Sequence, residues 1–235
     1  MKRIPRYLYI VFLTLIVAVL ALLLFRNKQG TIASHLETLP HRSFRIAYQD
    51  LRYTDHDGRP IVIGKRVRWV NIDDEWKEEA YAPDGQLKGT YLRTKEGIFA
   101  WRPLDDAVQY KGVYQASRQE FTTAEFLRSA KTFIREDTIL GYKAYVIGVS
   151  GQETFRVPEF GLTPLKIVFN KHSVLEAVEA VFEEVPAGSF VKPSLPVSTS
   201  WLEGEAQHLE KSGSVEDAKD IRDVIKRWKE SHIER

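Results

Sequence analysis

Residues 87–102 read LKGTYLRTKEGIFAWR, and this stretch decides the fold that the sequence predicts. Leu87 to Arg93 and Ile98 to Arg102 are two strand segments, and the short turn Lys95-Glu96-Gly97 separates them. Pro83-Asp84-Gly85 supplies a second tight turn just before the first strand. Short strands joined by tight turns are typical of an antiparallel sheet.

The same pattern continues on both sides of this stretch. Phe44, Ile46 and Tyr48 alternate with polar or small residues, which predicts a strand with one buried face. The segment Val174 to Val185 is rich in helix formers, but its flanking strands favour an edge strand. Further strands are predicted at 61–70, 76–82, 107–114, 142–149, 154–157 and 165–169.

Helices are predicted in two regions. Thr122-Thr123-Ala124-Glu125 resembles a capping box, and an apolar stripe that ends at Phe133 follows it. The highly charged tail predicts helices at 201–211 and 214–231. One face of the second tail helix is apolar, so it either packs on its own domain or binds a partner. The residues of that face are Val215, Ala218, Ile221, Val224, Ile225 and Trp228.

The N-terminus predicts a membrane anchor. Residues 7–25, YLYIVFLTLIVAVLALLLF, carry no charge, and as a helix they span roughly 28 Å. Lys2, Arg3 and Arg6 precede them, which favours an N-inside orientation. The alternative is a cleaved signal peptide with a weak site near Thr31-Ile32-Ala33. The predicted location is therefore a bacterial cell membrane, with a single span, the N-terminus inside and the main domain outside the cytoplasm.

Composition narrows the classes of function. The 34 basic and 32 acidic residues leave a net charge of +2, which does not indicate a nucleic-acid-binding face. The absence of cysteine excludes disulfides and thiolate chemistry. The six histidines lack metal-site spacing, and no nucleophile elbow, P-loop or dinucleotide motif is found. Asp55-His56-Asp57-Gly58 is interpreted as a hairpin turn. We therefore predict no enzyme activity, no catalytic residue, no metal and no cofactor.

Aromatic residues occur on nearly every predicted strand, and Ile98 to Trp101 is apolar on both faces. One face of that strand should pack against helices, and the other should meet a second layer, a lid or an apolar ligand. An ordinary core and a groove for acyl chains both fit this pattern. If a groove exists, its candidate ligand-binding residues are Trp69, Tyr91, Phe99, Trp101 and Tyr110.

The order of short motifs resembles a known family. The hairpin ending in Arg102-Pro103 is followed by Ile139-Leu140-Gly141-Tyr142, then by Gly161-Leu162-Thr163-Pro164, and finally by Val185-Pro186-Ala187-Gly188. This order is similar to that of the bacterial lipoprotein-carrier superfamily, which includes LolA, LolB and RseB-like proteins. The resemblance covers about residues 43–193. It implies a mainly β (α+β) fold, in which helices lie on the concave side of a curved antiparallel sheet that forms an unclosed barrel.

The expected organisation is a cytoplasmic N-terminus (1–6), a transmembrane anchor (7–25), a linker (26–42), a lipoprotein-carrier-like domain (43–193) and a charged helical tail (194–235). The resemblance implies binding of lipids or lipidated proteins, by an acceptor, sensor or envelope-assembly factor. The expected partners are the membrane, through residues 7–25, and an acyl chain or lipidated protein. The alternative is an interaction or signalling module with a solid core, which binds a protein through the sheet edge or the C-terminal helix.

Overall fold

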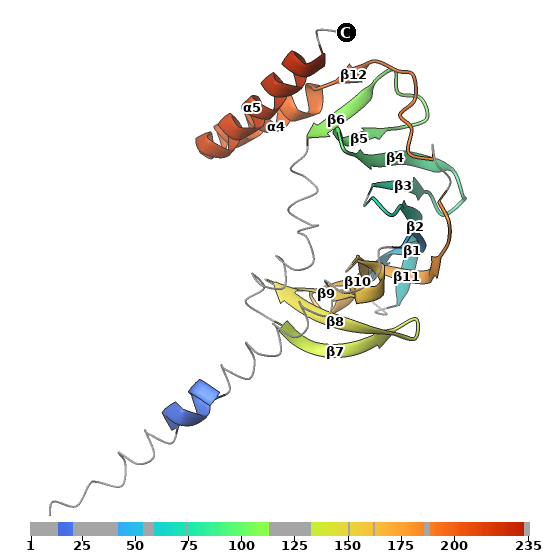
Figure 1. The fold of residues 1–235 in the computed structure, drawn as a ribbon, viewed down its shortest axis with the longest axis vertical. Coiled ribbons are helices and arrows are strands. Elements are labelled where there is room, and N and C mark those ends of the chain that lie inside the picture. Colours follow the sequence, from blue (N-terminus) through green and yellow to red (C-terminus); the bar gives the residue numbers. More distant parts are fainter. Residues whose placement is uncertain are drawn as a thin grey trace, which may run out of the picture.

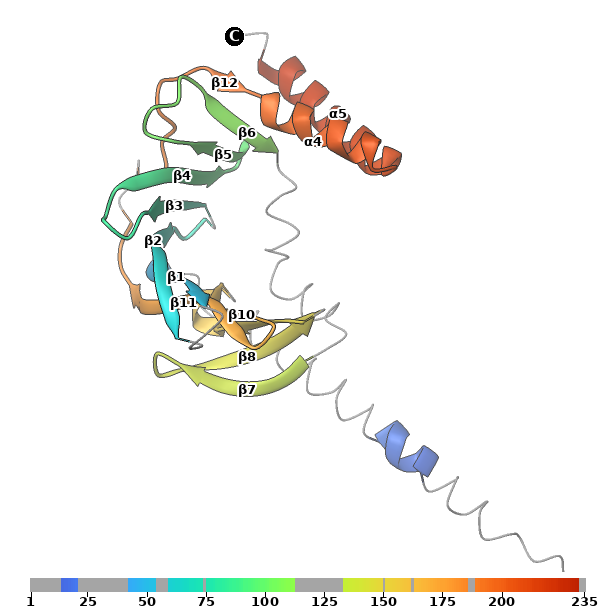
Figure 2. The ribbon, with the colours of Figure 1, turned by 180° about the vertical axis from the view of Figure 1, so that it is seen from behind.

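A computed structural model describes residues 14–20, 42–53, 59–73, 75–112, 133–149, 151–161, 163–185 and 189–232. Within them the chain forms one 12-stranded sheet, which curves into an open arc (Figures 1 and 2). The strands are β1 (Phe44–Tyr53), β2 (Pro60–Val70), β3 (Trp76–Tyr81), β4 (Leu87–Thr94), β5 (Gly97–Trp101), β6 (Val108–Gly112), β7 (Phe133–Ile139), β8 (Tyr142–Val149), β9 (Gln152–Arg156), β10 (Pro164–Phe169), β11 (His172–Phe182) and β12 (Val197–Ser198). The described helices include the 3-10 helix η1 (Pro158–Phe160), α4 (Ser200–Lys211) and α5 (Val215–His232).

The strand order across the sheet is β12-β6-β5-β4-β3-β2-β1-β11-β10-β9-β8-β7. All neighbours are antiparallel except at one edge, where β12 runs parallel to β6 and Val197 lies beside Val108. The predicted antiparallel pairing is therefore confirmed for every described pair of neighbouring strands except this one, which makes the sheet mixed. β11 lies in the middle of the sheet and β12 at its edge, next to β6. A long connection of this kind allows two strands to pair in parallel, as β12 and β6 do.

Most predicted strands are confirmed to within one or two residues at their start, including those at 61–70, 76–82, 87–93 and 142–149. The predicted edge strand at 174–185 is wrong in its position. This segment forms β11, which lies inside the sheet between β1 and β10. Its alternating Glu and apolar residues suit an exposed edge, but Lys166 on β10 and Arg45 on β1 form ion pairs with these glutamates.

The helix predicted after Thr122 was expected to extend to Phe133, and this end of the prediction is wrong. Phe133 begins β7, the strand at one end of the sheet, and its main chain pairs with Ile147 of β8. Antiparallel pairing with β8 outweighs the local helical pattern here. Residues 113–132, and with them the rest of that predicted helix, lie outside the described residues, as does the turn predicted at 55–58.

The predicted transmembrane helix is also corrected. In the part of the chain that the structure describes, no helix is long and apolar enough to cross a membrane. Of the predicted anchor, residues 14–20 are described and helical. The remaining residues of 7–25, the N-terminus and most of the linker lie outside the described residues.

The two faces of the curved sheet carry separate hydrophobic clusters. Register places Phe44 beside Val70, and Val70 beside Trp76, on one face, which we call the inner face. The cluster on this face, the inner cluster, consists of Phe44, Ile46, Tyr48, Val70, Trp76, Ile139, Ala144, Val146, Phe155, Val157, Phe160, Leu165, Ala177 and Ala180, each at most 9% exposed. This half of the sheet is therefore filled by its own side chains.

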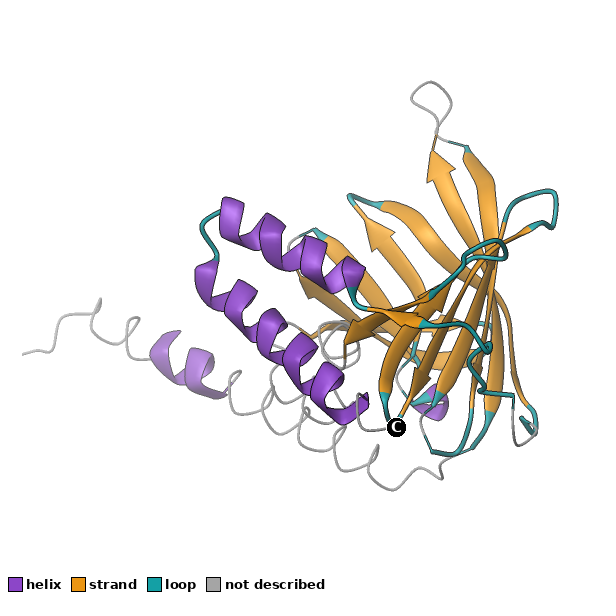
Figure 3. Cartoon of the chain, turned by 90° about the horizontal axis from the view of Figure 1, so that it is seen from above, coloured by secondary structure: helices purple, strands orange, loops and turns teal. Residues whose placement is uncertain are grey.

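The opposite, outer face carries the second cluster. Residues 189–196, which we call the strap, run along the outside of the arc from β11 toward β12 (Figures 1 and 2). Strap residues, α4 and α5 pack there against β4 to β6, and the outer cluster consists of Leu92, Phe99, Val108, Tyr110, Leu202, Ile225 and Trp228. The predicted C-terminal tail forms α4 and α5, which pack on the outer cluster beside the β6 edge (Figure 3).

The apolar stripe of the tail explains this position. Trp228 of α5 stacks on Tyr110 with ring centroids 4.0 Å apart, and it meets Phe99 edge-on at 5.6 Å. Ile225 and Trp228 are 7% and 8% exposed, so the stripe packs on its own domain. Burying an aromatic side chain of this size stabilises the folded chain by about 2–3 kcal/mol.

Candidate functional site

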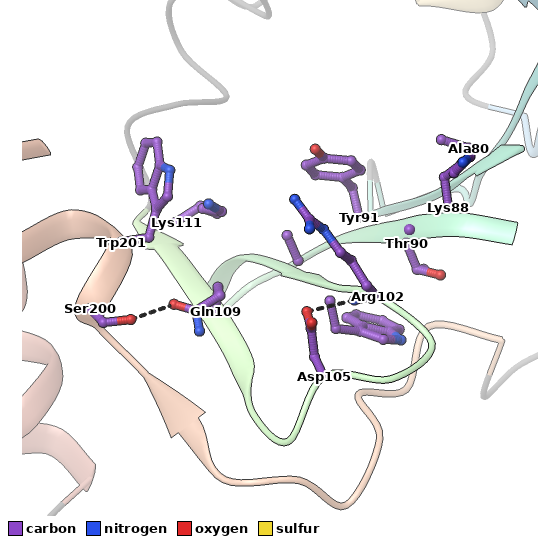
Figure 4. A pocket seen from close by; sticks show the side chains of 13 residues that line it. Ala80, Lys88, Thr90, Tyr91, Arg102, Asp105, Gln109, Lys111, Ser200 and Trp201 are labelled. Carbon is purple, nitrogen blue, oxygen red and sulfur yellow. Dashed lines mark hydrogen bonds between the residues drawn. The ribbon is translucent and has the colours of Figure 1, made fainter. Parts of the chain in front are cut away.

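A groove lies on the inner face, at the end of the sheet that the inner cluster does not fill. Its volume is about 650 Å³, within the range of ligand pockets. The sheet strands β3 to β6 form its floor, and the start of α4 closes one side (Figure 4). The residues lining it are Ala80, Lys88, Gly89, Thr90, Tyr91, Ala100, Trp101, Arg102, Asp105, Gln109, Lys111, Ser200 and Trp201.

Register explains which side chains reach this groove. Tyr91 lies beside Ala100, and Ala100 beside Gln109, so these three share the inner face. Their neighbours along each strand, Leu92 and Phe99, point to the outer cluster. The strand Ile98–Trp101 is thus apolar on both sides because its outer face packs on α5 and its inner face lines the groove, and the predicted contact with helices is confirmed.

Two aromatic side chains border the groove. Tyr91 is 43% exposed on the inner face. Trp201 is half-buried in the first turn of α4, one residue before Leu202, which packs in the outer cluster. Helix α4 therefore straddles the β6 edge: Leu202 lies in the outer cluster, and Trp201 lines the groove and also packs against that cluster. Figure 4 shows Tyr91, Arg102, Lys111 and Trp201 pointing to the same side of the sheet.

Polar contacts fix the wall made by α4. The Ser200 hydroxyl donates to the Gln109 side-chain oxygen at 3.0 Å, which ties the start of the helix to β6. The Ser198 hydroxyl donates to Ser200 Oγ at 2.9 Å and accepts from the Ser200 main-chain N–H. On the opposite side, the Arg102 main-chain N–H donates to Asp105 Oδ2 at 2.8 Å and closes the turn after β5. The groove therefore has a fixed rim on both sides.

The charge of the groove is mainly positive. Lys88, Arg102 and Lys111 line it together with a single acid, Asp105. The Lys111 ammonium lies 3.8 Å from the centre of the Trp201 ring, within cation–π distance. Burial, and after it the positive charge of Arg102, lower the pKa of Lys111 to about 8, against the opposing charge of Glu205.

A charged band separates the groove from the inner cluster. Glu78 on β3 is 5% exposed and accepts hydrogen bonds from Arg68 and Arg66. Arg66 also binds both oxygens of Asp50, and the Arg68 guanidinium lies 4.8 Å from the Trp76 ring centre. Burial raises the pKa of Glu78, but the two arginines outweigh it and hold that pKa below its usual value.

The five residues predicted to line one groove lie in three places. Tyr91 and Trp101 line the large groove, and Trp101 also packs against the outer cluster. Trp69 lines a smaller pocket of about 220 Å³ on the outer face, beneath the strap, together with Lys77 and Phe190. Phe99 and Tyr110 are 0% and 3% exposed inside the outer cluster. A role in ligand binding stays a prediction for all five.

Sequence reasoning missed Lys111 and Trp201. Alternation along 107–114 places Lys111 and Gln109 opposite Val108 and Tyr110, so that pattern could have indicated a polar inner face. Trp201 gave no such signal, because its position depends on how the tail packs. Among the described residues, no group of three or more His, Cys, Asp or Glu side chains is placed to hold a metal ion.

No family model matches the sequence, and no curated protein matches it. Among solved structures, the chain is similar to a conserved uncharacterised protein from Thermus thermophilus, with a TM-score of 0.47 and 10% identity over 72% of this chain and 98% of that one. It is also similar to PNGF-II, with a TM-score of 0.40 and 14% identity over 70% of this chain and 32% of that one. A LolA-superfamily protein from Nitrosomonas europaea gives a TM-score of 0.35 and 10% identity over 66% and 92% of the two chains. Since these scores lie below 0.5, the proposals below rest on this chain's own residues.

Proposed function

We propose that this chain is a binding module for lipids or lipidated proteins, and that an acyl chain lies in the groove between β4, β6 and the start of α4. The observation that carries the proposal is the groove itself. It has a volume of about 650 Å³, and Tyr91, Ala100 and Trp201 give it apolar surface on an otherwise charged part of the inner face. The inner cluster is filled, so the groove is where the described inner face offers room for a ligand.

The energetics of such a ligand are modest. Each methylene removed from water contributes about 0.8 kcal/mol, so ten methylenes contribute about 8 kcal/mol before the costs of association. A dissociation constant of 1 μM corresponds to about 8 kcal/mol net, and ordering the chain and the ligand costs several kcal/mol. We therefore expect an affinity for one acyl chain weaker than about 1 μM, as suits a carrier or acceptor that must release its cargo.

The test is a titration of the full chain with 1-myristoyl-lysophosphatidylcholine, followed by tryptophan fluorescence, together with native mass spectrometry of gently purified protein. Trp201→Ala and Tyr91→Ala should each weaken binding at least threefold, because both remove apolar surface from the groove. Trp69→Ala is the matched control, since Trp69 lines the separate outer pocket. The proposal fails if no acyl species copurifies and the lysolipid does not bind, or if only Trp69→Ala weakens binding.

A further inference from the structure

We infer that the groove selects amphiphiles with a net negative charge, and that Lys111 and Arg102 hold the anionic group while the apolar chain lies against Tyr91 and Trp201. This inference rests on the proposed function and deepens it, because it names the class of lipid. A phosphate or carboxylate next to an apolar chain is the chemistry that this combination of side chains recognises.

The first argument is the pairing of cations across the sheet. Three half-buried cations elsewhere on the chain have carboxylate partners: Arg68 lies 2.7 Å from Glu78, Lys166 3.0 Å from Glu176, and Lys192 2.7 Å from Glu96. In the groove, Lys111 is also half-buried, whereas Lys88 and Arg102 are exposed. Within the described part of the chain, none of these three forms an ion pair with a carboxylate.

The second argument is the position of the one acid in the groove. Asp105 accepts the main-chain N–H of Arg102 at 2.8 Å, so its carboxylate holds the turn after β5. Glu205 of α4 is the acid that acts on Lys111 electrostatically, and its attraction does not outweigh burial and the repulsion from Arg102. Two cations that repel each other across an open groove are stabilised when an anion lies between them.

The third argument is the geometry of Lys111. Its ammonium lies over the Trp201 ring, at the boundary between the apolar wall and the cationic rim. A ligand whose chain covers Trp201 therefore brings the adjoining headgroup next to Lys111. Figure 4 shows Arg102, just after β5, and Lys111 of β6 reaching toward the same side of the groove.

The experiment compares two lysolipids with the same myristoyl chain on the full-length protein. 1-Myristoyl-lysophosphatidylglycerol carries a net negative charge, and 1-myristoyl-lysophosphatidylcholine carries none. We expect the anionic lipid to bind about tenfold more tightly, because one charge-assisted contact contributes about that much. Lys111→Met and Arg102→Gln should each reduce this ratio toward one, because each should weaken binding of the anionic lipid more than binding of lysophosphatidylcholine, whose phosphate is balanced by its own choline. Lys219→Met, on an exposed position of α5, is the matched loss of charge and should keep the ratio.

Each outcome separates the two proposals. Equal binding of both lipids by the natural chain overturns charge selection and leaves the proposed function standing. Binding of neither lipid overturns both. Glycerol 3-phosphate is titrated as well: if it binds as tightly as the anionic lysolipid, the anion site stands and the acyl-chain proposal fails. If Lys219→Met lowers the ratio as much as Lys111→Met, general surface charge explains the preference and the site is refuted.

Discussion

Replacing Glu78 by glutamine should destabilise the fold more than any surface substitution of the same kind. The Glu78 carboxylate is 5% exposed, and its two oxygens lie 2.7 Å from Arg68 and 3.4 Å from Arg66. The glutamine would keep the shape of the side chain but remove the charge. The buried end of Arg68, whose side chain is 18% exposed, would then lose the charge of Glu78 beside it.

The magnitude follows from the geometry. Two unit charges about 4 Å apart interact by about 4 kcal/mol at an effective dielectric constant of about 20, so the two pairs contribute about 8 kcal/mol before desolvation. Burying the carboxylate costs several kcal/mol of that, and breaking such a pair on one side typically costs about 3–5 kcal/mol. Arg66 is 40% exposed and finds solvent or Asp50 instead. We therefore expect the lower end of that range, about 3 kcal/mol.

The assay is urea unfolding at pH 7, with Glu230→Gln as the control. Glu230 lies 3.9 Å from Lys226 in a pair whose side chains are 63% and 72% exposed, and such pairs contribute less than about 1 kcal/mol. Since the folded pKa of Glu78 is lowered, its contribution is complete above the unfolded value near 4.5 and is lost as pH falls through the folded value. The reasoning is refuted if Glu78→Gln and Glu230→Gln unfold at the same urea concentration, or if both lose stability equally as the pH falls from 5 to 2.

Three further changes test the outer face and the groove. Trp228→Ala should lower the free energy of unfolding by about 3–5 kcal/mol in urea, because it removes the ring that stacks on Tyr110, and a loss below about 1 kcal/mol would contradict the packing of α5. Gly97→Ala should cost at least about 2 kcal/mol in thermal unfolding, because φ is +137° and a Cβ would lie 2.6 Å from the Tyr110 ring; unchanged stability would contradict this turn. Lys111 has a folded pKa of about 8 against an unfolded value near 10.5, so its unfavourable charge is relieved as pH rises from 8 to 10.5. Lys111→Met should therefore be at least as stable as the natural chain at pH 7 and lack this rise in stability, and a loss of stability at pH 7 would show a structural role instead.

The strands could be predicted from the sequence because the burial of this sheet follows a period of two. Phe44, Ile46 and Tyr48 are at most 5% exposed, as their alternation predicts. Ile98 to Trp101 is apolar throughout, so contacts on both faces could be predicted: its outer face packs on α5 and its inner face lines the groove. These inferences need local pattern only, because successive side chains of a strand point to opposite faces whatever the strand pairs with.

The sequence pattern could not predict which face of the sheet the tail helices pack on. The tail helices have an apolar stripe that fits either side of the sheet, and the strap, which runs along the outside, leads them to the outer cluster. The partners of Glu78 also depend on register, since Arg66 and Arg68 lie on another strand. Lys111 is one of 34 basic residues in the sequence, and only its place beside Trp201 distinguishes it.

The division of the inner face suggests why a groove exists at the β6 end. From β1 to β3 the inner side chains form a filled cluster, and the band of Asp50, Arg66, Arg68 and Glu78 is balanced in charge and paired. The groove beyond this band is lined by three cations and one acid, Asp105, which accepts a hydrogen bond from the main chain. A filled core and a neutral band need no ligand to be stable, whereas exposed Tyr91 and a lysine with a lowered pKa both gain when something apolar and anionic covers them. The same feature of the groove thus costs stability in the free chain and supplies affinity in the complex, so stability and binding should change in opposite directions when Lys111 is replaced.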